Sequence, residues 1–365
     1  MEDLGETPNS FGKDHTQMLR AIDLFAGAGG LSLGMRAAGI TTACAIEIDA
    51  RRAETLAAHG TSAEIIASDI RQVDLSPYRG KVEIVFGGPP CQPFSSGGLR
   101  QAAADERNMV PAFVQAVRAV RPDAFLMENV PGLAVRERRG YFRAVLEELH
   151  ELGYHLAYEV LNAANYGAPQ KRRRLFVVGM RPRVFHFPAR THGPGGDFPY
   201  VVVNDVLPSH QIGDPNPSRV FYAKRPDIRP SPYDGHMFNG GGRPIDRCQP
   251  CHTILASAGG NKTHFFDDMK LVPEYHRHLM CGNPPRAGTL PGARRLTVLE
   301  SAIIQTFHPD TRFCGPRSSQ YQQVGDAVPP KLAEVLGRAL LRQLLASGEE
   351  EDGPDAPLRQ RLLWS

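Results

Sequence analysis

Short apolar runs alternate with helical patterns over the first 185 residues, and this alternation limits the possible fold more than any other feature of the sequence. The runs have the length and composition of strands, and the stretches between them carry apolar residues at helical spacing. We expect strands at 21–25, 42–48, 82–88, 124–129 and 174–180, with helices at 31–39, 50–60, 109–120 and 141–153. Because strands that alternate with helices form mostly parallel sheets covered on both faces, we expect a doubly wound α/β fold.

A second region, residues 186–317, lacks this pattern. It is rich in proline and glycine, holds nine of the 13 histidines, and has 15 Lys and Arg residues against 11 Asp and Glu residues. Such a loop-rich, mildly basic segment suits a recognition surface, and an irregular domain with scattered charge is an equal alternative. The chain of 365 residues also exceeds one compact core. We therefore expect a large domain of residues 16–185 and 318–346, with a smaller domain of residues 186–317 between its two parts.

The two ends of the chain differ from both regions. Residues 1–15 are polar and have no apolar leader, and residues 347–365 form an acidic tail, so we expect both to be flexible. No apolar run approaches the ~20 residues of a membrane span. The six cysteines lack the dense spacing of a secreted disulfide scaffold, which indicates a reducing compartment. We expect a cytoplasmic protein.

A glycine-rich turn, AGAGG, follows the first expected strand. Gly27, Gly29 and Gly30 would let the backbone approach a ligand at a helix N-terminus, with a purely structural turn as the alternative. Glu47 ends the second strand 20 residues after Gly27, where a carboxylate can accept both hydroxyls of an adenosine ribose. Asp69, after the next apolar run, is a candidate acceptor for the adenine amino group. Together these residues predict an adenosine cofactor and leave NAD and S-adenosylmethionine both open.

The segment GGPPCQPFSSGG, residues 87–98, holds Cys91 between prolines and glycines. Prolines restrict φ and glycines free it, so we expect a loop of fixed shape with the thiol at its centre. A cysteine in such a loop is often structural, but Glu128 ends the fourth strand beside the same crevice. Burial would raise the pKa of Glu128 and let it donate a proton near neutral pH. A thiol nucleophile and an acid in one pocket favour group transfer over hydride transfer, and hence S-adenosylmethionine over NAD.

Six motifs, taken together, resemble the DNA (cytosine-5) methyltransferase family of the bacterial modification type. In chain order they are DLFAGAGGLSLG, GGPPCQPFSSGG, MENVPG, NYGAPQKRRRLFVVG, ARRLTVLESAIIQTF and QYQQVGDAVPPKLAEVLG, and they span nearly the whole chain. The resemblance implies a Rossmann-like, S-adenosylmethionine-dependent domain, with residues 186–317 as the target-recognition domain. It further implies methyl transfer to C5 of a flipped-out cytosine in a short duplex DNA sequence, through a covalent bond between Cys91 and C6.

The resemblance also assigns site residues. It implies a cofactor site of Phe25, Gly27, Gly29, Gly30, Glu47, Ile48, Asp69, Asp326 and Ala327, with Ile48 against the adenine ring. It implies catalytic roles for Cys91, Pro90, Glu128, Arg172 and Arg174, and DNA contacts for Gln92 and Ser95. Glu128 would bond to cytosine N3, and alternation along a strand would bring Arg172 and Arg174 to the pocket together. No metal is implied.

Asp326 departs from the family pattern, which usually has Asn at this place in VGDAVPP. Asn donates and accepts hydrogen bonds, whereas an ionised Asp only accepts, so one hydrogen bond near the nucleophile loop is in question. We expect activity to survive where a neighbouring donor compensates.

The motif CQPCH, residues 248–252, has two further interpretations. It fits the pattern for covalent haem attachment, but neither an export signal nor a surrounding haem domain accompanies it. Cys248 and Cys251 also suit half of a zinc site, which would need two more ligands. The candidates for these are His276, His278 and Cys281. We expect two ordinary cysteines in a loop.

Two other functions share part of this sequence evidence. One is a tRNA cytosine methyltransferase, whose Cys-Phe-Thr signature is missing here; the other is a regulator that binds DNA without turnover, which intact Cys91 and Glu128 disfavour. We expect a monomer that acts on double-stranded DNA, with a restriction endonuclease for the same site as a candidate partner. The target bases cannot be read from the sequence, because specificity depends on how loops present side chains to the groove edges.

Overall fold

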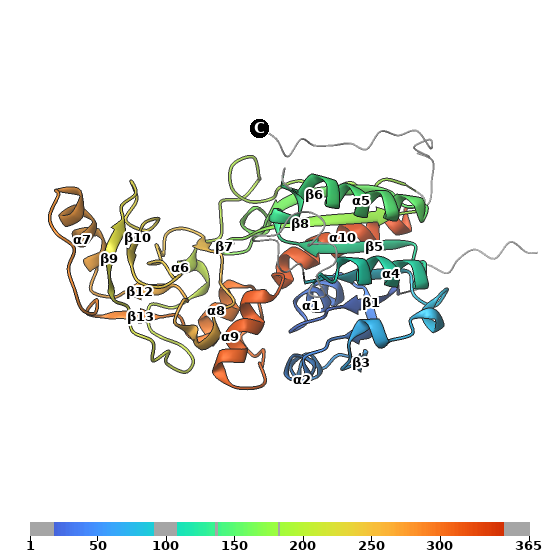
Figure 1. Ribbon diagram of the computed structural model, residues 1–365, viewed down its shortest axis with the longest axis horizontal. Helices are drawn as coiled ribbons and strands as arrows, with labels where there is room; N and C mark the ends of the chain where they lie inside the picture. Colours follow the sequence, from blue (N-terminus) through green and yellow to red (C-terminus); the bar gives the residue numbers. More distant parts are fainter. Residues whose placement is uncertain (1–17, 91–107, 136–137, 182, 347–365) are drawn as a thin grey trace, which may run out of the picture.

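The computed structural model describes residues 18–90, 108–135, 138–181 and 183–346. Its large part is built on a seven-stranded sheet in the order β3-β2-β1-β4-β5-β8-β6 (Figure 1). These strands are β1 (Arg20–Leu24), β2 (Thr41–Ile46), β3 (Glu64–Ile66), β4 (Ile84–Gly87), β5 (Ala124–Asn129), β6 (His155–Asn162) and β8 (Arg173–Met180). Neighbours from β3 through β5 pair in parallel, whereas β8 runs antiparallel to both β5 and β6. The doubly wound, mostly parallel sheet is confirmed.

Helices cover both faces of the sheet, because successive side chains of a strand point to opposite faces. The helices of the large part are α1 (Gly30–Ala37), α2 (Ala50–Ala58), α4 (Val110–Val120), α5 (Arg139–Glu151) and α10 (Pro330–Leu345). Val85 and Phe125 form one core with α4 and α5, whereas Ile84 and Leu126 form another with α1 and α10. None of the helices in the described ranges is long and apolar enough to cross a membrane.

Helix α10 brings the end of the described chain back to its beginning by packing along α1. The contact is close: a Cβ atom at Gly34 would lie 2.4 Å from the Cβ of Ala333, and one at Gly30 would lie 2.3 Å from the carbonyl oxygen of Val328. Side chains do not tolerate such distances, so α1 needs glycine at both positions. Helix α10 therefore completes one face of the sheet.

Shorter elements form a second lobe, drawn mainly in yellow and orange on the left of Figure 1. They are α6 (Val203–Val206), β9 (Tyr222–Asp227), β10 (His236–Phe238), β11 (Cys251–His252), β12 (Phe265–Asp267), α7 (Leu271–Met280), β13 (Ala293–Arg295) and α8 (Val298–Ile304). β7 (Gln170–Lys171) links this lobe to the large part by pairing with β11. α9 (Arg317–Asp326) packs against α8 and the short turn Ala258–Gly260, so it lies at the junction of the two parts.

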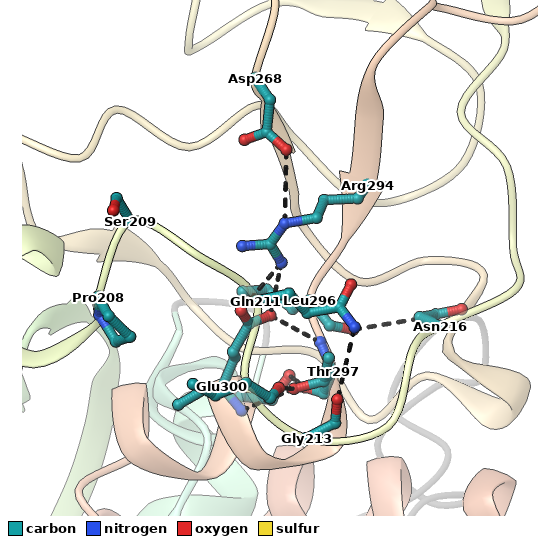
Figure 2. Close-up of polar contacts among 12 residues, drawn as sticks. Pro208, Ser209, Gln211, Gly213, Asn216, Asp268, Arg294, Leu296, Thr297 and Glu300 are labelled. Atoms are coloured by element: carbon teal, nitrogen blue, oxygen red, sulfur yellow. Dashed lines mark hydrogen bonds and ion pairs between the residues drawn. The ribbon is translucent and has the colours of Figure 1, made fainter.

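Arg294 fixes the start of α8 within this second lobe (Figure 2). Its Nη1 donates to both carboxylate oxygens of Glu300, at 2.9 and 3.0 Å, and its Nε lies 3.5 Å from Asp268. Glu300 in turn accepts from the N–H of Thr297, while the Thr297 hydroxyl accepts from the N–H of Glu300. This reciprocal cap satisfies two amides that the helix itself cannot bond, so α8 begins at a fixed place beside the junction.

Candidate active site

A cavity of about 690 Å³ opens where the parallel strands of the sheet end. Its lining comes from the turns after β1 and β2, the segments after β3 and β4, the end of β5, and the segment that joins α9 to α10. The strand order reverses between β1 and β4 at this edge, which is where doubly wound sheets bind their ligands.

Glu47 follows the end of β2 and is 7% exposed. Its Oε2 accepts from the N–H of Gly27 at 2.7 Å, and its Oε1 accepts from the N–H of Asp49 at 2.9 Å. Each oxygen keeps a free lone pair, so the fixed carboxylate can still accept two hydroxyl groups. Ile48 also lines the cavity and is 67% exposed, which presents an apolar surface to a planar ring.

The turn after β1 has the left-handed backbone that its glycines predict. φ is 58° at Phe25, 55° at Gly27 and 77° at Gly29. Phe25, Gly27 and Gly30 line the cavity, but Gly29 does not. A Cβ atom at Gly29 would lie 2.5 Å from Cδ1 of Leu56, so the glycine is required by the packing of α2. Its expected contact with a cofactor stays a prediction.

Asp69 lines the cavity beyond β3, and its carboxylate is bonded by Arg71. The backbone N–H of Arg71 donates to it at 3.0 Å, and the guanidinium donates at 2.6 to 3.1 Å. These hydrogen bonds lower the pKa of Asp69 below its usual value. The group is thus an ionised acceptor at the same end of the cavity as Glu47.

The opposite end of the cavity holds a buried carboxyl group beside a guanidinium group. Glu128, in β5, lies 2.9 Å from the Nε of Arg174, in β8. Burial raises the pKa of Glu128, and the guanidinium groups of Arg174 and Arg172 offset part of that rise. The direction agrees with the sequence prediction. Gly88 permits the close approach, because a Cβ atom there would lie 2.9 Å from Oε2 of Glu128.

Arg172 does not line the cavity with Arg174, and its expected catalytic role stays a prediction. It lies between β7 and β8, so the alternation of β8 does not extend to it. Its fully buried guanidinium donates to the carbonyl oxygens of Ile254 at 3.1 Å and of Gly325 at 2.8 Å. Burial lowers its pKa to about 9, so the group stays charged at neutral pH. Through these two hydrogen bonds, Arg172 connects Ile254 of the second lobe to the end of α9, beside the cavity.

Two hydrogen bonds hold the chain where the predicted nucleophile segment begins. Asn129 Nδ2 donates to the carbonyl oxygen of Pro89 at 3.0 Å, and the N–H of Met109 donates to that of Pro90 at 2.9 Å. Sequence reasoning missed Asn129, although its place directly after Glu128 was a usable signal. Pro90 lies at the cavity as expected. Cys91, Gln92 and Ser95 lie outside the described residues.

Asp326 and Ala327 line the cavity at the end of α9. Asp326 Oδ2 accepts from Nη2 of Arg52, in α2, at 2.7 Å. The acid at this place is therefore paired with a guanidinium from another helix.

The CQPCH segment shows no sign of a metal site. Cys251 is buried and Cys248 is exposed, and both are free thiols. Within the described ranges, no three His, Cys, Asp or Glu side chains are grouped so as to hold a metal ion.

A doubly wound sheet with an acid-lined cavity at its switch point, and a buried glutamate at the far end, defines a class of adenosine-cofactor enzymes. Comparison with known proteins narrows the class. Residues 19–342 match the model of the C-5 cytosine-specific DNA methylase family, so the chain belongs to that family. Its members use S-adenosylmethionine as methyl donor, and this chain is a DNA (cytosine-5)-methyltransferase.

Relatives of this chain are bacterial modification enzymes. It is 33% identical to the type II methyltransferase M.PspPI of Psychrobacter, over 90% of this chain and 80% of the relative. It is 32% identical to M.AplI of Arthrospira platensis, over 90% and 87%. A DNMT2 mutant structure from Spodoptera frugiperda shares the fold, with a TM-score of 0.65 at 16% identity over 88% of this chain and 99% of the other.

Proposed function

We propose that one end of the cavity binds the cofactor and that the opposite end binds the target cytosine. The Glu47 carboxylate binds the ribose hydroxyls, Ile48 covers the adenine ring, and Asp69 accepts from the adenine amino group. The fixed carboxylate, the exposed apolar side chain and the ionised acceptor at one end fit an adenosine group well. S-adenosylmethionine bound there supplies a methyl group on a positively charged sulfur.

The opposite end receives a cytosine flipped out of the duplex. Cys91, as thiolate, adds to C6, and the displaced π electrons spread over C5 and N3, where Glu128 places its proton. C5 becomes nucleophilic and takes up the methyl group. A base then removes the C5 proton, the C5–C6 double bond forms again, Cys91 leaves as thiolate, and the N3 proton returns to Glu128. Arg174 holds Glu128 in place and faces the O2 side of the base.

One observation carries the proposal. The buried carboxyl group of Glu128, whose pKa is raised, lines the same cavity as the Glu47 carboxylate, which is held in place by a backbone N–H and can accept ribose hydroxyls. A raised pKa favours a proton on Glu128, and the N3 step requires such a proton donor.

Trapping on fluorinated DNA tests the covalent step, once sequencing of DNA from cells that express the chain has given the target. With fluorine at C5 of the target cytosine, addition and methylation proceed but elimination fails, because fluorine cannot leave as a positive ion. We expect an enzyme–DNA adduct that survives denaturing electrophoresis and requires S-adenosylmethionine. Glu128→Gln should slow its formation roughly 10²–10⁴-fold, the usual contribution of general acid catalysis.

Two cysteine variants make the test specific. Cys91→Ala should abolish the adduct, whereas Cys248→Ala, which removes an exposed thiol of the second lobe, should leave it unchanged. An adduct that persists in Cys91→Ala, or turnover of fluorinated DNA without trapping, would rule out Cys91 as the nucleophile.

The partner and the assembly follow from the same proposal. The chain protects a DNA site in the cytoplasm against an endonuclease that cuts the same sequence, as the type II names of its relatives suggest. We expect it to act as a monomer. Light scattering of the purified protein, and a search for a nuclease encoded beside it, test these two points.

A further inference from the structure

A second pocket, of about 400 Å³, lies between the large part and the second lobe, and we call it the junction pocket. Leu33 and Ala37 of α1 and Pro330 of α10 line it from the large part. Val206 of α6 and Ile303 of α8 line it from the second lobe. Among the described residues, none lines both this pocket and the cavity at the edge of the sheet.

The junction pocket is suited to an apolar occupant. Leu33, Val206 and Ile303 are only half-buried, so part of their apolar surface still contacts water. The charges at its rim balance each other, because Nζ of Lys331 lies 3.2 Å from the carboxylate of Glu334. A concave site of this volume with an apolar lining is typical of a binding site for apolar groups.

The sequence after α10 contains apolar side chains of the right kind. Residues 347–365 lie outside the described residues, and their sequence has two different halves. Residues 349–352 are acidic (EEED), whereas residues 358–364 read LRQRLLW and hold three leucines and the only tryptophan of the chain, Trp364. Large apolar side chains gain stability when they leave water, so the second half favours contact with an apolar surface.

Helix α10 leads from this segment back to the junction pocket. Arg342 and Arg338 are both exposed on α10, and Arg338 Nη2 donates to the carbonyl oxygen of Ala37, at the pocket, at 3.0 Å. These cations suit the acidic residues 349–352. The 16-residue helix is about 24 Å long, whereas the residues from its end to Leu358 can extend to about 40 Å. The apolar half can therefore reach the pocket.

We propose that residues 358–364 bind in the junction pocket of the same chain, with the acidic residues 349–352 beside the arginines of α10. Leu362, Leu363 and Trp364 cover the half-buried apolar side chains of α1, α6 and α8. Because both parts of the molecule line the pocket, the bound segment bridges them and restrains the second lobe against the large part. The proposal gives a bound position to part of the tail, which the sequence alone predicted to be flexible.

Fluorescence of Trp364 in the full chain tests the proposal directly, because the chain has no other tryptophan. An indole ring that leaves water emits at shorter wavelength and is quenched less by dissolved acrylamide. We expect both effects in the full chain, relative to a synthetic peptide of residues 347–365. Equal emission and equal quenching in the two samples would overturn the proposal.

A pair of alanine substitutions tests whether the pocket is the binding site. Ala37 is exposed at the end of α1, so Ala37→Arg should fold normally while its side chain obstructs the pocket. We expect its Trp364 emission to shift to that of the peptide. Ala58→Arg is the matched control: Ala58 is exposed at the end of α2 and belongs to the described lining of neither the pocket nor the cavity. Its emission should equal that of the wild type, and unchanged emission in Ala37→Arg would rule out this site.

Dilution distinguishes binding within one chain from binding to a second copy. Binding within one chain does not depend on protein concentration, so the short-wavelength emission should persist as the protein is diluted. Emission that moves to that of the peptide on dilution would show a contact between two copies and would contradict the proposal.

Discussion

Asp23 has no exposed surface and lies in β1, the central strand beside the switch point. The hydroxyl of Ser32 donates to its Oδ2 at 2.6 Å, and its Oδ1 has no hydrogen-bond partner within the described ranges. Burial raises the pKa of Asp23 to about 8, and the charge of Glu47 adds to the rise. In the unfolded chain the same group titrates near ~3.9, so folding takes up a proton between these two values.

The stability of the protein should therefore fall as pH rises from 5.5 towards 8, because the folded state holds a proton that the unfolded state has lost. A single such group contributes a slope of up to about 1.4 kcal/mol per pH unit. Asp23→Asn cannot titrate, so its loss of stability over this range should be smaller than that of the wild type. Melting temperatures of both proteins at pH 5.5 and 8 measure the difference. Equal pH dependence would show that Asp23 is ionised in the folded protein.

Individual site residues were predictable where a strand end fixes their place. Glu47 follows β2 and Glu128 lies near the end of β5, and the structure brings both to one cavity. Arg172 lies between β7 and β8, and sequence does not show that these are separate strands. Arg52 gave no signal, since its contact with Asp326 joins residues that are 274 positions apart in the chain.

At the scale of elements, the pairing of α1 with α10 decides the shape of the cofactor end. Added Cβ atoms at Gly30 and Gly34 would meet backbone or Cβ atoms of the closing segment rather than movable side chains. The segment 326–328 that lines the cavity directly precedes α10. The contact that packs α10 against α1 therefore also positions one wall of the cavity.

A pair of glycine substitutions tests this contact. Gly34→Ala should destabilise the protein by about 1–3 kcal/mol, because the new methyl group would lie 2.4 Å from Ala333 and α10 must shift. It should also weaken S-adenosylhomocysteine binding. Gly140→Ala, in α5, is the control: nothing lies within 4 Å of the new atom, so helix propensity should make it neutral or stabilising. Denaturant unfolding compares the two, and equal stability of the variants would contradict the close packing.

The alternation of patterns predicted the parallel strands β1, β2, β4 and β5 and their helices, but neither β3 nor β6. β3 has only three residues, too few for the apolar run before Asp69 to predict a strand, and most residues of β6 are half-buried, so no apolar run marks it. The antiparallel direction of β8 was not predictable from its composition. The second lobe has short strands held by side-chain contacts such as Arg294 with Glu300, and local patterns do not encode those.

At the scale of the whole molecule, the cavity and the second lobe are built from different residues. Residues 186–317 contribute nothing to the lining of the cavity. They meet the large part at the junction, where Arg172 bonds to Ile254 and α9 packs on α8. The outer part of the lobe has its own core around Phe238 and Tyr275.

Exchange of residues 222–238, which hold β9 and β10, for the corresponding loop of a relative should change the DNA sequence that is methylated. The Kd of S-adenosylhomocysteine should stay within about twofold, because no residue of this segment lines the cavity. Sequencing of methylated DNA and calorimetry give the two readouts. Loss of cofactor binding with DNA binding intact would contradict the division between the two lobes.

The contact between Gly30 and Val328 has a consequence for how the enzyme is made. One wall of the cavity is synthesised about 300 residues after the other, which takes roughly 15–60 s at ~5–20 residues per second. Throughout that time the growing chain has the glycine turn and the Glu47 carboxylate but no segment to close over them. A ribosome-bound or truncated chain therefore lacks one wall of the cavity, and we expect methyl-donor binding only in chains whose synthesis has reached α10.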